Sequence, residues 1–284
     1  MELFKRNWRL SIEVNNIIKT YQELSANDTS LKIEFETHSA IKSLNSGGQI
    51  NITGLTNKDI AFLSTNFKDG VLAPSLVTLE AGYSNELAMI LNGNIIAIEP
   101  DFTNPDTTLK MQIMAAVNNN LLNNHVFNNI KGSATFKDIC ILAANNNNLT
   151  LKYDDSILNK IIEDYAFNGT PLQQLKELQS FNDKVDISID KKHLIVSNKI
   201  SNNVTKIIIN SKNGLIGTPK PTAIGCEVTT LLRPSLLLSD IITLESVKLP
   251  QLNGDYKIIN ISHKGANRGD AWYTNLFLGK ADYA

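Results

Sequence analysis

The chain has 284 residues and is close to electrically neutral, with 27 Lys and Arg against 28 Asp and Glu. A chain of this length buries roughly three quarters of its unfolded surface, so it needs no metal or disulfide staple and has room for two domains. Its charge balance argues against a nucleic-acid-binding protein, because such proteins gather Lys and Arg against phosphates, and here the basic residues are scattered.

The two cysteines, Cys140 and Cys226, are too few for a disulfide framework and lie in no CxxC pattern, so we expect both to be reduced and buried. No run of about 18 apolar residues occurs, and the amino end lacks the apolar segment of a signal peptide. We therefore expect neither export by that route nor a membrane span. The 35 asparagines favour many short elements joined by tight turns.

The first hundred or so residues predict a β-domain. Strands are expected where apolar and polar residues alternate, at 8–14, 31–35, 50–52, 77–81 and 108–115. A short helix is expected after Gly54, with a cap at Thr56 or Asn57. It would carry Ile60, Leu63 and Phe67 on one face.

An Asn-Gly pair predicts a hairpin in this domain. Both central residues of a type I′ turn need positive φ, so Asn92-Gly93 is expected to join strands at 86–91 and 94–99. We also expect positive φ at Gly254, near the other end of the chain. Valine at Gly93 or Gly254 should then disrupt a hairpin.

Residues 117–200 predict a small α/β module. A boundary is expected at 117–129, where asparagine runs interrupt any periodicity. One helix would follow a cap at Ser133 or Thr135, and a second would be capped by Thr170 with Pro171 in its first turn. The buried stripes would be Phe136, Ile139, Cys140 and Ala143 in the first helix and Leu172, Leu175, Leu178 and Phe181 in the second. Strands would follow at 149–153, 185–189 and 194–197.

The rest of the chain is again strand-rich. Strands are expected at 207–209, 227–232, 241–246, 256–263 and 272–278, separated by clusters of Gly, Pro, Asn or Ser. The layout is therefore β, then α/β, then β. We expect a first β-domain at 1–116, the α/β module at 117–200 and a second β-domain at 201–284.

Catalytic motifs are missing from the sequence. The four histidines, His38, His125, His193 and His263, form no HExxH pattern, and neither GxSxG nor the P-loop motif occurs. The segment 214–217 lacks the third glycine of a dinucleotide site and is interpreted as a turn. We therefore assign no catalytic, cofactor-binding or metal-binding residue.

Paired carboxylates could indicate a glycosidase, because such an enzyme needs only two acids, one with a raised pKa, about 5 to 9.5 Å apart. The adjacent pairs are Asp154-Asp155 and Glu163-Asp164. Such neighbours are expected by chance among 28 acids. The favoured interpretation is solvated surface acids.

Two stretches of the chain resemble a known family. The first contains Ile50–Leu55, Val77-Thr78-Leu79-Glu80-Ala81-Gly82-Tyr83 and Asn92-Gly93-Asn94-Ile95; the second contains GLIGTP at 214–219, LLRP at 231–234, Glu245-Ser246, NGDYKI at 253–258, His263 and Trp272. Together they resemble the baseplate hub protein of contractile-tailed bacteriophages. One departure is Ser239-Asp240, where such proteins tend to have Gly-Asp; serine can make the same turn.

The resemblance implies a mainly β (α+β) fold in which two tail-tube-like β-barrel domains flank a small α/β module. It also implies a non-enzymatic homotrimer whose six β-domains join a six-fold tail tube to a three-fold central spike. Tape-measure and baseplate wedge proteins are further candidate partners. DNA would pass through the lumen without specific binding, with no cofactor and no membrane. The expected location is the virion tail baseplate, after synthesis in the host bacterial cytoplasm.

Two alternatives stay open. One is a tube or hub component of a tailocin or another contractile injection system, which has the same fold. The other is a tail-associated cell-wall hydrolase. The hydrolase would need a carboxylate pair in a cleft of the 117–200 module.

Overall fold

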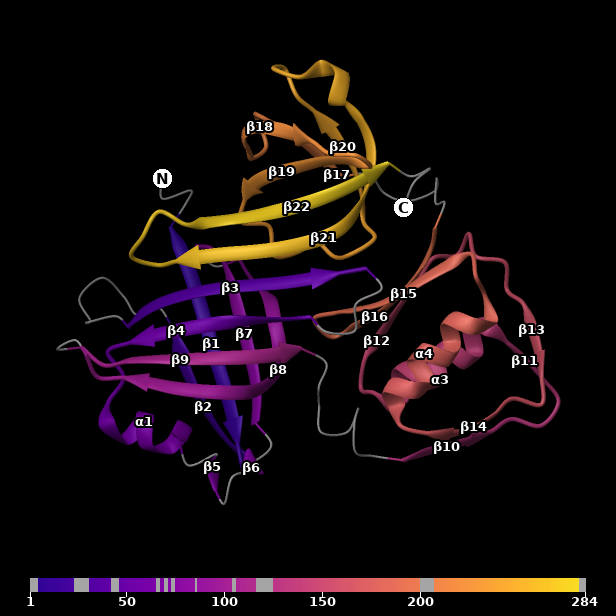
Figure 1. Ribbon diagram of the computed structural model, residues 1–284, viewed down its shortest axis with the longest axis horizontal. Helices are drawn as coiled ribbons and strands as arrows, with labels where there is room; N and C mark the ends of the chain where they lie inside the picture. Colours follow the sequence, from indigo (N-terminus) through magenta and orange to yellow (C-terminus); the bar gives the residue numbers. More distant parts are fainter. Residues whose placement is uncertain are drawn as a thin grey trace.

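The computed structural model describes residues 5–22, 31–41, 46–64, 67–68, 71–72, 75–84, 86–103, 106–115, 125–199 and 207–280. This part of the chain is mainly β, as the sequence predicts (Figure 1). None of its helices has the length and apolar character needed to cross a bilayer. The expected domain boundaries at 116/117 and 200/201 fall outside the described residues and stay predictions.

A first β-unit contains β1 to β9 and α1. Its elements are β1 (Arg6–Val14), β2 (Ile17–Gln22), β3 (Lys32–Ala40), β4 (Gly47–Thr53), α1 (Asn57–Ser64), β5 (Phe67–Lys68), β6 (Val71–Leu72), β7 (Ser75–Tyr83), β8 (Glu86–Asp101) and β9 (Thr108–Ala115). Seven of the strands pair in the order β3-β4-β9-β8-β7-β1-β2. Alternate residues such as Leu10, Ile50 and Leu79 are fully buried in one core, which α1 joins through Ile60 and Leu63.

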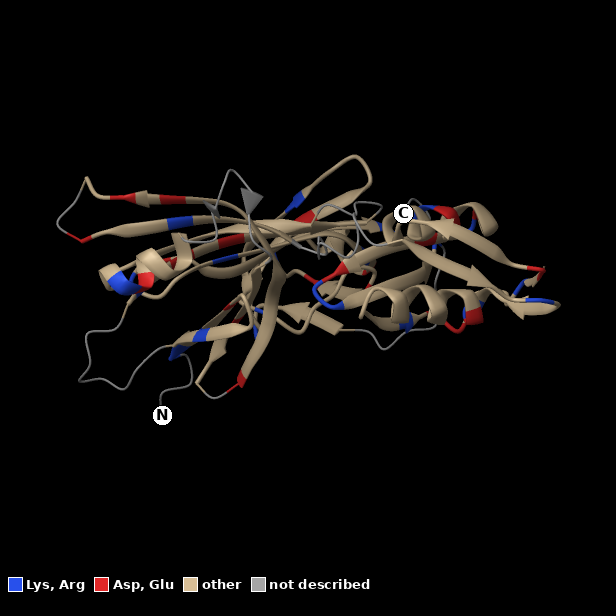
Figure 2. Cartoon of the chain, turned by 90° about the horizontal axis from the view of Figure 1, so that it is seen from below, with Lys and Arg blue, Asp and Glu red and all other residues tan. Residues whose placement is uncertain are grey.

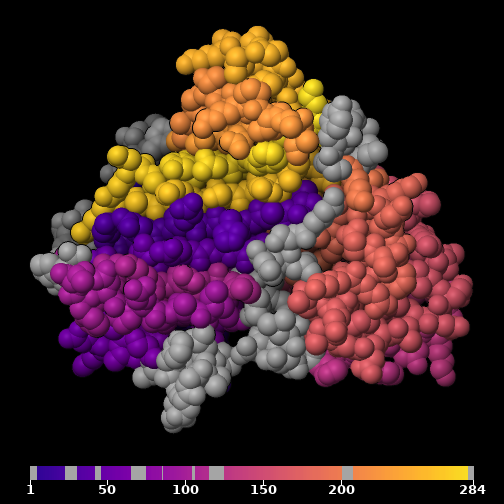
Figure 3. Space-filling model, in the orientation of Figure 1, coloured from indigo at the N-terminus to yellow at the C-terminus, as the bar shows by residue number. Residues whose placement is uncertain are grey.

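The module and a second β-unit follow. The module contains β10 (Val126–Asn129), β11 (Ser133–Thr135), α3 (Phe136–Asn146), β12 (Thr150–Tyr153), β13 (Ile161–Glu163), β14 (Ala166–Gly169), α4 (Pro171–Phe181), β15 (Val185–Asp190) and β16 (His193–Asn198). The second β-unit contains β17 (Ile207–Asn210), β18 (Leu215–Pro221), β19 (Gly225–Leu231), β20 (Ile241–Glu245), the 3₁₀ helix η1 (Pro250–Leu252), β21 (Gly254–Ala266) and β22 (Trp272–Lys280). The module lies to one side of both β-units (Figure 3).

The predicted turn at Asn92-Gly93 is wrong. Strand β8 continues through both residues, and Gly93 pairs with Val77 of β7 on one side and Ala115 of β9 on the other. The Asn92 Nδ2 donates to Thr78 Oγ1 at 2.9 Å instead of capping a turn. Strands β7 and β9 both pair with this part of β8, so tertiary pairing overrides the preference of Asn-Gly for a turn. The glycines with positive φ in the described chain do not include Gly93.

A type I′ turn does occur elsewhere in the first β-unit. Asn15 and Asn16 have φ of 49° and 64° and join β1 to β2, with Val14 opposite Ile17. Asparagine tolerates this conformation better than most residues, and both central positions of the turn require it. The positive φ expected at Gly254 is confirmed at 146°, but Gly254 begins β21 opposite Leu244 and does not lie in a hairpin turn.

The expected helix near residue 60 is shorter than predicted. It ends at Ser64, and Phe67 belongs to the two-residue strand β5, so Phe67 is not part of the helical face. Ile60 and Leu63 are buried as expected. Thr56 caps the start, since its Oγ1 accepts from the Asp59 amide at 3.2 Å.

Both module helices are confirmed. Thr135 and Thr170 each form a capping box, with Asp138 and Gln173 respectively at the third helical position. These boxes satisfy amide donors that a helix start would otherwise leave unpaired. The predicted stripe of the first helix is buried, and Cys140 lies in it. Burial raises the pKa of the Cys140 thiol to about 12.

The two β-units share one sheet. Residues 260–266 of β21 pair antiparallel with residues 34–40 of β3, so the strand order runs β18-β19-β22-β21-β3-β4-β9-β8 without interruption (Figure 1). We call the β21–β3 contact the unit joint. The described pairings form an open path, and closure of either unit into a barrel stays an expectation.

The second β-unit repeats the pairing pattern of the first. The order β18-β19-β22-β21-β20 corresponds to β3-β4-β9-β8-β7, with every pair antiparallel. Each long strand has a bulge at the same place, between Ile95 and Ala97 in β8 and between Ile258 and Asn260 in β21. The segments Val77–Glu80 and Ile242–Glu245, both ending in Thr-Leu-Glu, occupy the same position.

A pair of glycines marks the same repeat. A Cβ on Gly47 would lie 2.5 Å from the Ile113 carbonyl oxygen, and a Cβ on Gly225 would lie 2.1 Å from that of Leu278. Ile113 and Leu278 are corresponding positions on β9 and β22. Only glycine allows the neighbouring strand to approach this closely.

Alanine at Gly225 should therefore destabilise the protein. Its Cβ would meet main-chain atoms that cannot move without distorting β22, so we expect the free energy of unfolding to fall by about 1–3 kcal/mol. Urea unfolding measures the change. Gly269→Ala is the matched control, because its Cβ would meet a methyl group at 3.0 Å. Equal losses in the two variants would contradict this account.

Candidate channel face and assembly joints

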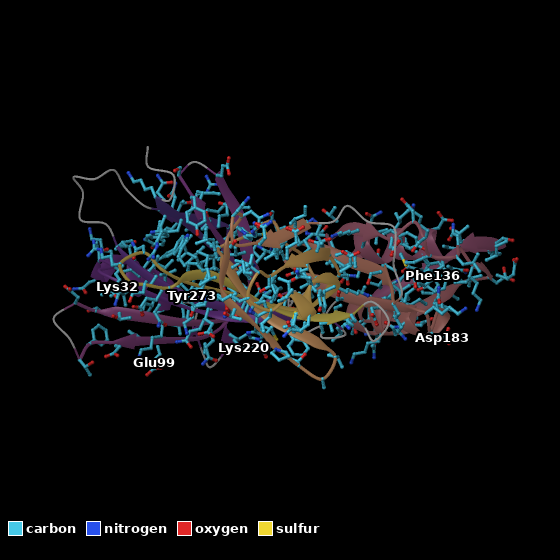
Figure 4. All side chains as sticks on the ribbon, turned by 90° about the horizontal axis from the view of Figure 1, so that it is seen from above. Lys32, Glu99, Phe136, Asp183, Lys220 and Tyr273 are labelled. Carbon is cyan, nitrogen blue, oxygen red and sulfur yellow. The ribbon has the colours of Figure 1, made fainter. Side chains whose placement is uncertain are left out.

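One side of the continuous sheet carries mainly polar side chains, with a few apolar ones such as Phe277 and Ile216 among them. Side chains that alternate with the core residues point to this side on eight adjacent strands, and we call it the polar face. Its charged members are Lys32, Lys110, Lys220 and Lys264 with Glu34, Glu36, Glu99, Asp101 and Glu227. Glu99 and Lys220, from opposite ends of the sheet, both lie toward the lower side of Figure 4.

The charges on the polar face are mixed in sign and mostly paired. Lys264 contacts Glu36 at 3.0 Å, Lys32 contacts Glu34 at 2.8 Å and Lys110 contacts Asp101 at 3.0 Å. Figure 2 shows Lys and Arg interspersed with Asp and Glu along the strands. The face thus carries no concentrated positive charge of the kind that would hold a phosphate backbone.

An aromatic residue from the second β-unit fills the core of the first at the unit joint. Trp272 is 4% exposed and belongs to the first hydrophobic core, and its Nε1 donates to the Gly82 carbonyl at 3.2 Å. The ring of Phe35 on β3 meets it edge to face at 5.4 Å. Burial of a ring this large makes it a principal stabilising contact between the units.

Two polar residues close the same joint. Tyr83 Oη accepts from the Leu232 amide at 3.1 Å, and burial raises the pKa of this phenol. Arg6 Nη1 donates to the Ala266 carbonyl at 2.8 Å, and its guanidinium lies 5.6 Å from the centre of the Trp272 ring. The start of β1 and the end of β7 are thereby tied to the second unit.

His263 lies at the centre of the unit joint. It is 2% exposed, its Nδ1 lies 2.9 Å from Thr274 Oγ1, and its amide donates to Thr37 Oγ1 at 3.3 Å. Burial, with a smaller contribution from the Lys191 ammonium, holds the pKa of this imidazole well below its ordinary value. The folded state therefore keeps His263 neutral.

A pH dependence follows from this burial. Below about pH 6.5 the unfolded chain takes up a proton at His263 and the folded chain does not, so stability should fall as pH falls. The loss should approach 1.4 kcal/mol per pH unit until the folded-state pKa is reached. Urea unfolding at pH 7.5 to 5 should show a shallower slope for His263→Gln than for the original chain. Identical slopes would contradict the assignment.

The module is attached to the second β-unit by a buried ion pair. Lys257 Nζ lies 3.3 Å from Asp186 Oδ2, and each side chain is 1% exposed. Lys257 also donates to the Asn198 carbonyl at 3.0 Å. Asp186 is on β15, all of whose residues are buried. The strand packs against α4 on one face and against the β-units on the other.

Further polar contacts extend this attachment to both β-units. Asp190 of β15 accepts from Ser39 of β3 at 3.0 Å and from the Leu238 amide at 3.2 Å. Lys191 Nζ donates to the Leu236 carbonyl at 2.9 Å. Burial lowers the pKa of Lys191, although Asp190 partly offsets the effect. No pattern in the sequence marks these charges as buried, because Asp190-Lys191-Lys192 has the composition of an ordinary exposed turn.

The carboxylate pairs have local roles. Asp154 and Asp155 line a hollow of about 400 Å³ between the module and the second β-unit, together with Asp240. Asp154 Oδ1 accepts from the Ser156 amide at 2.9 Å, Asp155 pairs with Lys137 at 2.9 Å, and Asp240 pairs with Lys152. The other pair, Glu163-Asp164, lies elsewhere in the module and bonds to β11 and its preceding turn.

The remaining candidate groups are dispersed. No cluster of three or more His, Cys, Asp and Glu that could hold a metal occurs in the described ranges. The cysteines are free and buried, as expected, and burial raises the pKa of Cys226 to about 11.

Several residues of the motifs behind the family resemblance lie at the contacts between the two β-units or between a β-unit and the module. Leu232 of LLRP enters the first core, Lys257 of NGDYKI meets the module, and His263 and Trp272 form the unit joint. Ser239, where the family tends to have Gly, takes a φ of 65°. Serine therefore makes the expected turn in a conformation that glycine adopts more easily.

The comparisons show which class of protein has this fold. A 43 kDa tail protein of prophage MuSo2 from Shewanella oneidensis is 9% identical, with 97% of each chain covered and a TM-score of 0.62. A tail protein from Neisseria meningitidis MC58 is 10% identical, again with 97% of each chain covered, at a TM-score of 0.60. The E. coli c3393 protein, a type VI secretion component described as similar to T4 tail proteins gp27 and gp5, is 8% identical. It has a TM-score of 0.57, with 94% of this chain and 76% of that chain covered.

The fold is thus that of phage tail proteins. The model of the baseplate hub gp41 family matches residues 12–277, and the chain belongs to this family. A comparison with curated proteins finds no match. The family confirms the resemblance drawn from the sequence motifs, and it makes the chain a structural component of the bacteriophage tail baseplate.

Proposed function

We propose that this hub protein forms a trimeric ring that joins a six-fold tail tube to a three-fold central spike. The observation that carries the proposal is the internal repeat: one chain supplies two β-units with the same strand pairing. Three chains would then present six similar units on one side while keeping three-fold symmetry on the other. Closed rings of this kind are the usual solution for homo-oligomers.

The polar face suits the wall of a channel for DNA. Its charged side chains are mixed in sign and largely paired with one another, so it offers no array of free cations to phosphates. We propose that this face lines the lumen and that DNA passes without specific binding. The hydrophobic cores lie on the opposite side of the sheet.

Native mass measurement tests the ring. The expected result is a species of three times the 31.4 kDa chain mass, alone or with the tube and spike proteins added. Particle images should show three-fold or pseudo-six-fold symmetry with a central opening. A stable monomer in the presence of both partners would overturn the proposal.

We also propose that the protein is not an enzyme. The acids around the hollow beside the module bond to neighbouring groups that account for their positions. A zymogram on bacterial cell walls should show no clearing. Clearing that is lost in Asp154→Asn but kept in Glu163→Gln would instead identify a cell-wall hydrolase.

A contractile injection system without DNA is a second candidate, because a type VI secretion component has the same fold. Purified particles distinguish the two. A hub recovered with DNA-filled heads supports the phage tail, whereas a hub recovered only in headless tails supports the injection system.

A further inference from the structure

Four Asn-Gly pairs occur in the chain, at 92–93, 168–169, 213–214 and 253–254. Such a pair can modify itself: the main-chain nitrogen of the glycine attacks Cγ of the asparagine side chain, and ammonia leaves. Water then opens the five-membered imide that has formed, giving aspartate or isoaspartate. Glycine favours the attack because it has no Cβ to obstruct it. The reaction needs an amide side chain that can rotate and a main chain that can leave its folded conformation.

Hydrogen bonds hold the two asparagines of the second β-unit in place. Asn213 Oδ1 accepts from the Asn210 amide at 2.9 Å, and its Nδ2 donates to the Ile208 carbonyl at 2.7 Å. Asn253 Oδ1 accepts from the Ser246 amide at 2.6 Å. Rotation of either side chain toward the glycine nitrogen would break these bonds, so both pairs are protected from attack.

Strand pairing protects the pair in the first β-unit. Asn92 is 8% exposed, and its Nδ2 donates to Thr78 Oγ1 at 2.9 Å. At Gly93 the strand β8 is paired with β7 on one side and with β9 on the other. The glycine nitrogen could reach Asn92 Cγ only if β8 separated from both neighbours, which requires unfolding of the large sheet.

The pair Asn168-Gly169 lies at the end of β14 and has neither kind of protection. The Asn168 side chain is exposed and has no hydrogen bond to any other residue that the structure describes. In the described chain β14 pairs only with β10, over four residue pairs, and the two form a separate two-stranded sheet. An isolated pair of strands is marginally stable, so this one can open without disturbing the rest of the chain.

We propose that Asn168 is a site of spontaneous deamidation and that the other three Asn-Gly pairs stay intact in the folded protein. The Gly169 nitrogen forms a bond to Asn168 Cγ while the Cγ–Nδ2 bond breaks, and Nδ2 leaves as ammonia with the amide proton of Gly169. Water completes the reaction by adding to either carbonyl of the imide. The product places a carboxylate on the surface of the module, opposite Phe127 of β10. A subunit built into a tail is not exchanged, so the change accumulates with the age of the particle.

Isoaspartate at this position would disturb the start of α4. Gln173 lies against Gly169, since a Cβ on Gly169 would come within 2.7 Å of Gln173 Oε1. The same oxygen accepts from the Thr170 amide at 2.7 Å in the capping box. Isoaspartate lengthens the main chain by one carbon, so Gly169 and Thr170 could not both keep these positions. An ordinary aspartate keeps the main-chain length and should leave the cap intact.

Peptide mapping by mass spectrometry tests the site. The folded protein is kept warm at mildly alkaline pH, and each Asn-Gly peptide is followed for the mass increase that converts an amide into an acid. The Asn168 peptide should convert at least about tenfold faster than the other three, because opening the other sites costs more free energy. In urea all four peptides should convert at similar rates. Equal rates in the folded protein, or faster conversion at another pair, would overturn the proposal.

Two variants separate the site from its effect on the helix. Asn168→Gln should abolish conversion at this position, because attack on glutamine requires a larger and less favourable ring. Asn168→Asp reproduces the ordinary product, so hydrogen exchange at the start of α4 should stay unchanged. Aged protein that an isoaspartyl methyltransferase labels should exchange several-fold faster there. Aged protein that exchanges as slowly as Asn168→Asp would contradict the effect on the helix, and conversion that continues in Asn168→Gln would contradict the site.

Discussion

Replacing Lys257 by methionine should lower the free energy of unfolding by about 3–5 kcal/mol, because it leaves the Asp186 carboxylate buried without its counter-ion. Both side chains are 1% exposed, so water cannot compensate the lost charge. Urea unfolding of the purified protein measures the loss. We expect the contacts between module and second β-unit to open first, which hydrogen exchange at β15 would reveal.

Two further variants make this test specific. The double variant Lys257→Met with Asp186→Leu should recover most of the loss, since apolar residues of similar volume can replace a buried pair. Lys32→Met is the matched control, because the Lys32–Glu34 pair is 42% and 45% exposed and should be worth at most about 1 kcal/mol. If Lys257→Met costs no more than the control, the buried pair does not hold the module in place.

Truncating Trp272 to alanine should cost about 3–5 kcal/mol and should weaken the unit joint selectively. The indole fills the first core from the second unit, contacts Phe35 and donates to the Gly82 carbonyl. Its loss would leave a cavity between two β-units that belong to one sheet. Urea unfolding should then change from a single transition to two, as the units lose their coupling.

The neighbouring residue provides the control for this substitution. Tyr273 follows Trp272 on β22 but points to the polar face, so Tyr273→Ala should cost much less. Trp272→Phe should restore part of the stability, because a smaller ring still fills some of the space. Equal losses for Trp272→Ala and Tyr273→Ala would contradict the role given to the indole.

Local sequence patterns were enough for much of the fold. Alternation in β1 and in β3 placed Trp8 and Ile33 in the core, and the capping residues Thr135 and Thr170 marked both module helices. These features depend on neighbours a few residues apart, so the sequence reports them directly. The family assignment likewise came from short motifs, and the match over residues 12–277 confirms it.

Patterns of the same kind failed where distant segments decide the outcome. Asn92-Gly93 has the composition of a turn but lies inside β8, because β7 and β9 pair with it from both sides. The type I′ turn at Asn15 and Asn16 was not predicted, because it contains no Asn-Gly pair. The buried charges Asp186 of β15 and Lys191 in the turn after it also escaped prediction, because their partners lie more than forty residues away.

Local periodicity, helix caps and short motifs are enough to predict the layout of β, α/β and β segments, the module helices and the family. That the two β-units share one sheet and repeat one pairing pattern became visible only in the folded chain. That repeat is almost invisible in the residues, because strand pairing uses main-chain groups that nearly any side chain permits.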